Sequence, residues 1–430
     1  MGYGAVFSED QRGDDNEGFE RALADFQAAL RHPDVGSWVD EGGRTSLHRR
    51  DTLIVAVEDL DDRRLVDNRL DLGITDESYE AARETRRGRR PLPFAAVDLE
   101  PGQSIVAVSR YLRSLGGRRP LRLGPDHVLF PMQGIGFGPA SPPKLPSSAP
   151  AARTLKAHAS KAKAAVPTVK VAVLDTGYVP GDPVTDACTE YAEPDHLWEP
   201  VSRQFRHWVG GHGTHVAGVV AGAAGGAVRI RHYNVSESFS GTLPLVSDTV
   251  LAAAVADAIA NKCRILNLSL GGPTAIDLGL PATALVLGRS SGERKARGEQ
   301  ADDAVVVASA GNEATTHPMF PAAMKGVVAV GALDAGGNRA DFSNHGWWVD
   351  CATVGVDVLG PYADTDDAVE PNFDGYAEWS GTSFAAPFVA GRIAAAMNGQ
   401  GIGSARIAAA TVLSLGSPLD PTLGLGVRIS

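Results

Sequence analysis

The chain has 430 residues, 43% of them hydrophobic, and is longer than one hydrophobic core usually accommodates, which favours two domains. Its formal net charge of −11 gives no bulk electrostatic support for binding to nucleic acid or to an anionic membrane. The three cysteines are widely spaced and form no Cys-x-x-Cys pair, so they imply neither a disulfide framework nor a metal cage.

Residues 1–18 are acidic and polar, whereas a secretory signal has a basic start followed by an apolar core. Elsewhere the apolar runs are too short to span a bilayer. We therefore expect a cytoplasmic protein, with secretion as the alternative if a signal has been removed.

Residues 1–132 are predicted to form a small α/β domain. Apolar residues at helical spacing predict helices over 19–30 and 104–115. Short apolar runs predict strands over 52–57, 94–97 and 127–130. An arginine-rich run at 86–90 follows the charged segment 77–84, and it is interpreted as a solvated loop, with a docking patch or cleavage site as the alternative.

Residues 133–167 are rich in proline, glycine and alanine, which predicts an exposed linker that proteases could cut. Beyond it, short apolar runs at 169–174, 265–268, 304–308 and 327–330 alternate with helical segments such as 249–260 and 383–397. This alternation predicts an α/β fold whose mainly parallel sheet is covered by helices on both faces. Functional side chains of such sheets gather at the carboxyl ends of the strands.

Three short stretches in this second domain carry reactive side chains: VAVLDTG at 171–177, GGHGTHVAG at 210–218 and GTSFAAP at 381–387. Asp175 closes a predicted strand, whereas His212 and Ser383 open predicted helices. A serine hydroxyl needs a general base and a carboxylate that orients the base before it can act as a nucleophile. Ser383, His212 and Asp175 can fill these roles in turn.

The order Asp, His, Ser and the flanking residues resemble the subtilisin-like serine proteases (subtilases) over roughly 168–430. The segment AVVVASAGNEA at 304–314 resembles the family segment that carries the oxyanion-hole asparagine, which implies that role for Asn312. The stretch ILNLSLGG at 265–272 resembles the family strand that pairs with extended substrate. The implied substrate-binding residues are Ser269, Leu270, Gly271, Gly272, Ser309, Ala310 and Gly311.

By the same resemblance, residues 316–321 border the pocket for the residue before the scissile bond, where Met319 and Phe320 favour a hydrophobic or small side chain. Catalysis is expected to need no cofactor. His212 and His215 share a helix face, but no acidic residue stands between them, so zinc is not expected. Many subtilases bind calcium; the acidic loop with Asp364, Asp366, Asp367 and Asp374 offers oxygen ligands, although a solvated loop is the preferred interpretation.

Together these features predict a serine endopeptidase that acts on protein or peptide substrates through an acyl-enzyme. A catalytically silent peptide-binding or scaffold protein and a peptide-processing serine acyltransferase or esterase remain as alternatives. Subtilases commonly carry a small propeptide whose last strand blocks the cleft. The 1–132 domain is interpreted as such a propeptide, or else as a retained regulatory domain.

Overall fold

A computed structural model describes residues 34–40, 43–85, 92–131, 143–147, 169–191, 208–238, 244–275, 279–296, 303–362 and 375–430. The helix predicted over 19–30, the arginine-rich run 86–90 and the acidic loop with Asp364 to Asp374 lie outside the described residues. Of the predicted linker, the structure describes residues 143–147, where Lys144 forms an isolated bridge with Glu378.

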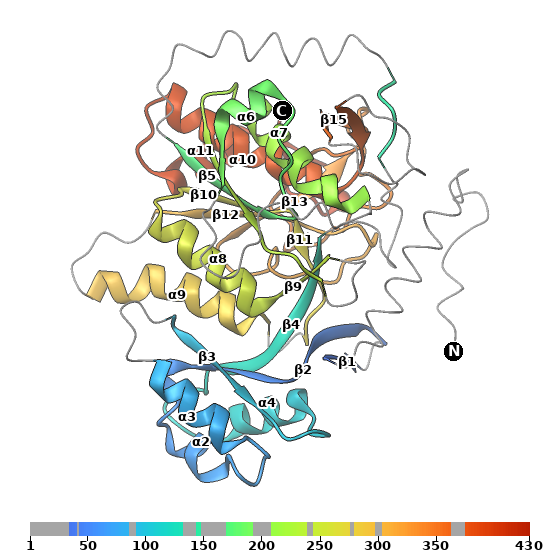
Figure 1. The fold of residues 1–430 in the computed structure, drawn as a ribbon. Coiled ribbons are helices and arrows are strands. Elements are labelled where there is room, and N and C mark those ends of the chain that lie inside the picture. The colour runs from blue at the N-terminus through green and yellow to red at the C-terminus, as the bar shows by residue number, and fades with distance from the viewer. Residues whose placement is uncertain are drawn as a thin grey trace.

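A nine-stranded sheet forms the centre of the larger, C-terminal part, with the strand order β17-β18-β14-β13-β12-β10-β5-β7-β6 (Figure 1). Its pairings are parallel except that β17 and β18 are antiparallel. The strands are β5 (Lys170–Asp175), β6 (Thr189–Tyr191), β7 (Arg229–Asn234), β10 (Ile265–Leu268), β12 (Val305–Ser309), β13 (Val327–Leu333), β14 (Cys351–Val354), β17 (Ser417–Pro418) and β18 (Val427–Arg428).

Helices cover both faces of this sheet, as the sequence predicts. In β5, Val171 and Val173 belong to one hydrophobic cluster, whereas Ala172 and Leu174 belong to another, because successive side chains of a strand point to opposite faces. The first cluster includes residues of α7 (His212–Ala223), α10 (Thr382–Gly399) and α11 (Ala405–Ser414). The second includes residues of α8 (Asp248–Ala260) and α9 (Pro281–Ala296).

The N-terminal part is a smaller α/β unit with its own hydrophobic cluster, which includes Leu53, Val97 and Leu112. Its elements are β1 (Val35–Val39), β2 (Thr45–Ala56), α2 (Arg63–Asn68), α3 (Asp76–Thr85), β3 (Phe94–Asp98), α4 (Ile105–Ser114) and β4 (Leu123–Pro131). The predicted strands and the helix at 104–115 are present, the helix being capped by the Ser104 hydroxyl, which accepts from the main-chain N–H of Ala107. The helix α3 falls on the charged segment 77–84, where the sequence predicted no element.

Strand β4 connects the two parts (Figure 1). Its first half pairs with β2, and its end pairs antiparallel with β9 (Pro244–Ser247) and with β11 (Leu270–Gly271) of the larger part. In this register Leu270 lies opposite Pro131 and Gly271 opposite Phe130. The remaining described elements are α6 (Pro183–Cys188), β8 (Glu237–Ser238), β15 (Val358–Pro361), β16 (Tyr376–Trp379) and the 3-10 turns 57–59, 208–211 and 421–423.

Candidate active site

Asp175 and His212 form a buried hydrogen-bonded pair at the carboxyl end of the sheet. Asp175 is the last residue of β5, and His212 is the first residue of α7. Nδ1 of His212 lies 2.6 Å from Oδ1 of Asp175, and both side chains are fully buried. Because the carboxylate can only accept, it orients the ring with the proton on Nδ1 and leaves Nε2 as the basic atom.

The Asp-Thr-Gly and His-Gly sequences bring these two elements into contact. The main-chain N–H of Gly213 donates to Oγ1 of Thr176 at 2.9 Å, and the N–H of Thr176 donates to Oδ1 of Asp175 at 2.7 Å. A Cβ atom at position 213 would lie 2.5 Å from the carbonyl oxygen of Thr176. Only glycine therefore lets α7 begin this close to the turn after β5.

Ser383 lies in the first turn of α10, which packs directly against α7. The ring of its neighbour Phe384 is centred 5.4 Å from the His212 ring, and Trp379 meets the same imidazole edge-on at 5.7 Å. The Nε2 atom of His212 is buried and has no hydrogen-bond partner among the described residues. The structure thus places the start of α10, which carries the predicted nucleophile, beside the predicted base and its orienting carboxylate.

Asn312 follows β12 and is held by the start of α10. Its Oδ1 accepts from the main-chain N–H of Thr382 at 2.9 Å and from the Thr382 hydroxyl at 2.8 Å. The same hydroxyl accepts from the N–H of Gly311 at 3.0 Å. Because Oδ1 accepts from Thr382, the opposite end of the Asn312 amide is its donor nitrogen.

The predicted substrate-binding residues lie on two neighbouring segments. Ser269 donates through its hydroxyl to the carbonyl oxygen of Ser383 at 2.8 Å, and Leu270 and Gly271 form β11 beside β4. Gly272 exchanges main-chain hydrogen bonds with Phe320 at 2.9 and 3.0 Å. Ser309, Ala310 and Gly311 lead from β12 to Asn312, and all three are buried.

Because Phe320 forms hydrogen bonds with Gly272, the segment 316–321 lies beside the predicted substrate strand. Met319 is 6% exposed and belongs to the same hydrophobic cluster as Leu270 and Ala310. The role of this segment as an apolar pocket wall stays a prediction.

His215 is not part of this site. Its ring is centred 4.6 Å from Phe384 and 5.7 Å from Trp379. Burial, and then the nearby His212, lower the pKa of His215 to about 3, so its ring is neutral at physiological pH. Within the described ranges, no cluster of three or more His, Cys, Asp or Glu side chains could hold a metal ion.

Two buried polar groups have no counterpart in the predictions. Asn344 bonds to the residues on either side of Asn312, from a position in the loop between β13 and β14. Asp248 accepts from the N–H groups of Ala282 and Thr283 at the start of α9. The partners of both are about 30 positions away in the chain, so no local sequence motif marks them.

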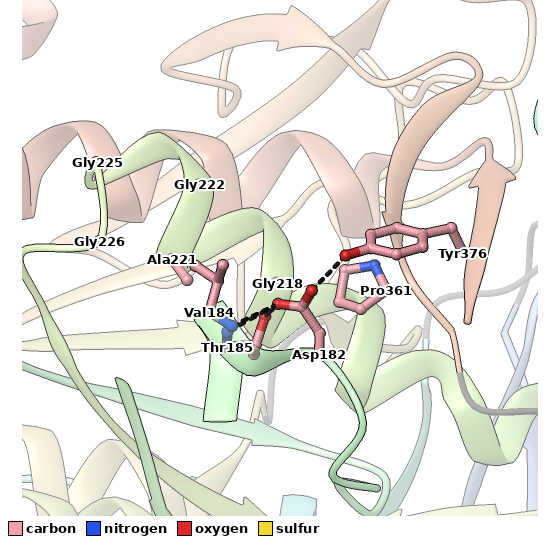
Figure 2. Close-up of a pocket in the computed structure, with 10 residues that line it drawn as sticks. All are labelled: Asp182, Val184, Thr185, Gly218, Ala221, Gly222, Gly225, Gly226, Pro361 and Tyr376. Carbon is pink, nitrogen blue, oxygen red and sulfur yellow. Dashed lines mark hydrogen bonds between the residues drawn. The ribbon is translucent and has the colours of Figure 1, made fainter. Parts of the chain in front are cut away.

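A separate hollow lies beside α6 and α7 (Figure 2). Figure 2 shows Asp182 at its centre, bonded to Tyr376 and to the first turn of α6. The lining residues are Asp182, Val184, Thr185, Gly218, Ala221, Gly222, Gly225, Gly226, Pro361 and Tyr376, and none of them is a predicted site residue. Asp182 is the N-cap of α6, and this capping role explains why a carboxylate lies in the hollow.

In the part of the chain that the structure describes, no helix is long and apolar enough to cross a membrane.

Comparisons with known proteins show which family and fold this chain resembles. The model of the subtilase family (Peptidase_S8) matches residues 167–414. A thermophilic serine proteinase of Bacillus sp. (strain AK1) is 33% identical over 54% of this chain, which spans 52% of that protein's length. Subtilisin BL of Lederbergia lenta is 30% identical over 53% of this chain and 75% of its own length. Among solved structures, a mutant of the protease domain of PatA shares the fold, with a TM-score of 0.50 and 21% identity over 61% of this chain and 92% of that one.

Proposed function

Because the chain belongs to the subtilase family, we propose that it is a serine endopeptidase with Asp175, His212 and Ser383 as its catalytic triad. The observation that carries the proposal is the 2.6 Å hydrogen bond between Asp175 and His212, both fully buried, beside the start of α10. A nucleophilic serine requires this arrangement of carboxylate and imidazole.

In the proposed reaction the Oγ of Ser383 attacks the peptide carbonyl while Nε2 of His212 takes the serine proton. Asp175 stabilises the imidazolium that forms and keeps its orientation. His212 then gives the proton to the departing amine, which leaves an acyl-enzyme on Ser383. Water activated by the same imidazole hydrolyses this ester and restores the serine.

The negative oxygen of the tetrahedral intermediate is proposed to bind the side-chain N–H of Asn312 and the main-chain N–H of Ser383. Two observations support these donors. Oδ1 of Asn312 accepts from Thr382, which identifies the opposite end of the amide as the donor nitrogen. Ser383 lies in the first turn of α10, where main-chain N–H groups carry partial positive charge.

Protein or peptide substrate is proposed to bind as an added strand along Ser269 to Gly272. The end of β4 already pairs in this way with Leu270 and Gly271. Main-chain pairing of this kind recognises any extended peptide and leaves sequence selection to side-chain pockets. The N-terminal part is accordingly proposed to act as a propeptide-like inhibitor that covers the cleft with β4.

Leu129 supports this inhibitory role. Its side chain is fully buried in the hydrophobic cluster of the larger part, together with Val246 and Leu270. A Cβ atom at Gly272 would lie 3.3 Å from Cδ2 of Leu129, so the strand and the cleft are in van der Waals contact.

The direct test is hydrolysis of a fluorogenic peptide by the purified chain and by Ser383→Ala and Asp175→Asn variants. We expect Asp175→Asn to lower kcat by about 10⁴-fold, because an asparagine favours the wrong imidazole tautomer, and Ser383→Ala to lower it by more than about 10³-fold. Equal melting temperatures would show that the variants are folded. Hydrolysis that survives both substitutions would refute the proposal, and ester cleavage without peptide cleavage would identify an esterase instead.

A further inference from the structure

Asn344 is a fully buried amide that contacts the oxyanion loop, defined here as residues 310–315, on both sides of Asn312. Before Asn312, its Nδ2 donates to the carbonyl oxygen of Ala310 at 3.0 Å, and its main-chain N–H donates to the carbonyl oxygen of Gly311 at 2.9 Å. After Asn312, its Oδ1 accepts from the N–H groups of Glu313 and Thr315, each at 3.0 Å.

The same Nδ2 also donates to Oε2 of Glu313 at 2.5 Å. Both donor hydrogens and the acceptor oxygen of the Asn344 amide are therefore used on the oxyanion loop. A hydroxyl of serine or threonine could not reach all these partners, and an aspartate could not donate to the carbonyl oxygen or to the Glu313 carboxyl.

The oxyanion loop needs such a support because its backbone is not regular. Gly311 has a φ of 106° and Ala314 a φ of 53°, and the second value is unusual for a residue with a side chain. A backbone of this kind persists when surrounding groups fix it.

Asn312 is thus held at two points. Thr382 fixes its side-chain oxygen from the start of α10, and Asn344 fixes its main chain from the loop between β13 and β14. An oxyanion donor is effective when its position is set before the charge develops, and an error of about 1 Å can cost about 100-fold in rate.

We infer that Asn344 is a positioning residue of the oxyanion hole, which holds residues 310–315 so that the amide of Asn312 points at the developing negative charge. This inference rests on the proposed role of Asn312. Asn344 itself touches neither Ser383 nor His212 through any bond that the structure gives, so it acts through the loop.

The test compares kcat and KM for a fluorogenic peptide in Asn344→Ala, Asn312→Ala and the double variant, per mole of Ser383 that a fluorophosphonate labels. We expect Asn344→Ala to lower kcat by about 10- to 100-fold while KM changes by less than about threefold. In the Asn312→Ala background, Asn344→Ala should lower kcat by less than about twofold, because the donor that Asn344 positions is already absent.

Two further variants separate positioning from folding. Asn344→Ser keeps a small polar side chain that cannot reach all the partners of the amide, so it should fold and show the same dependence on Asn312. Asn261→Ala removes an amide at the end of α8 that donates to the carbonyl oxygen and the carboxylate of Asp257, and the structure gives it no bond to residues 310–315, so its kcat should stay within about twofold of wild type.

An equal kcat loss from Asn344→Ala in both backgrounds, or an unchanged kcat in Asn344→Ser, would overturn the inference. If Asn312→Ala alone left kcat unchanged, the proposed oxyanion role of Asn312 would fail, and the inference with it. If Asn312→Ala lowered kcat and the Asn344 variants did not, only the inference would fail.

Discussion

Asp248 is a single carboxyl group that caps a helix in the interior of the molecule. Its oxygens accept from the N–H groups of Ala282 and Thr283 at 2.7 and 3.0 Å. Burial, and then the nearby Asp126, raise the pKa of Asp248 to about 7. Asp126 comes from β4 and binds the start of α8, since it accepts from the N–H and hydroxyl of Thr249 at 3.0 and 2.8 Å.

This raised pKa predicts that stability falls as the pH rises. A carboxyl whose pKa is higher in the folded than in the unfolded state contributes fully below the unfolded value, and the contribution is lost as pH rises through 7. Between pH 5 and 8 we expect the free energy of unfolding to fall by about 2–4 kcal/mol more in the parent than in Asp248→Asn, which cannot ionise. Urea unfolding of inactive Ser383→Ala chains measures this without self-digestion.

Asp420 offers a matched control, because it caps the 3-10 turn 421–423 through Thr422 but is exposed. Between pH 5 and 8, the free energy of unfolding should change by the same amount in Asp420→Asn as in the parent. If the free energy of unfolding changed equally with pH in the parent and in Asp248→Asn, the account of Asp248 would be contradicted.

At the scale of elements, the site depends on the close packing of α7 and α10, which carry His212 and Ser383 at their starts. Gly391 of α10 lies at the crossing point. A Cβ atom there would lie 2.6 Å from Cβ of Ala223 and 2.7 Å from the carbonyl oxygen of Val220, both in the facing helix.

Gly391→Ala should therefore push the helices apart and destabilise the fold by about 1–3 kcal/mol. It should also lower kcat, because the separation between base and nucleophile changes. Gly399→Ala is the control in the same helix, since a Cβ atom there meets nothing within 4 Å, and it should stabilise the chain by up to about 1 kcal/mol. Equal melting temperatures for Gly391→Ala and Gly399→Ala would contradict this packing argument.

The elements also show which parts of the fold a sequence can predict. Strand β10 has the predicted bounds, because a short run of four successive buried residues is typical of a strand in the middle of a parallel sheet. Helix α3 was missed because half of its residues are charged and, among those whose burial the structure describes, Tyr79 and Ala82 alone are buried. The start of each site helix is marked by a local motif, whereas Asn344 is defined by partners about 30 residues away and could only be found in three dimensions.

At the scale of the whole molecule, the two parts are joined along β4, whose end lies where substrate is proposed to bind. The strands β2, β3 and β4 and the helix α4 of the smaller unit could be predicted from hydrophobic periodicity. The pairing with Leu270 and Gly271 could not be derived from periodicity, since strand register across units depends on both surfaces. It was expected only because the sequence resembles a family that uses such a strand.

The central claim is that Ser383 is an activated nucleophile that β4 covers. The most direct measurement is the rate at which a fluorophosphonate modifies Ser383, followed by mass spectrometry. We predict labelling of Ser383 in the wild type and no label at this position in Ser383→Ala. Labelling should be faster in Leu129→Asp, because a charge at this fully buried position weakens β4 docking, but not in Leu70→Asp, where the side chain is 61% exposed. A folded wild-type chain whose Ser383 stays unmodified, in the parent and in Leu129→Asp alike, would contradict the account.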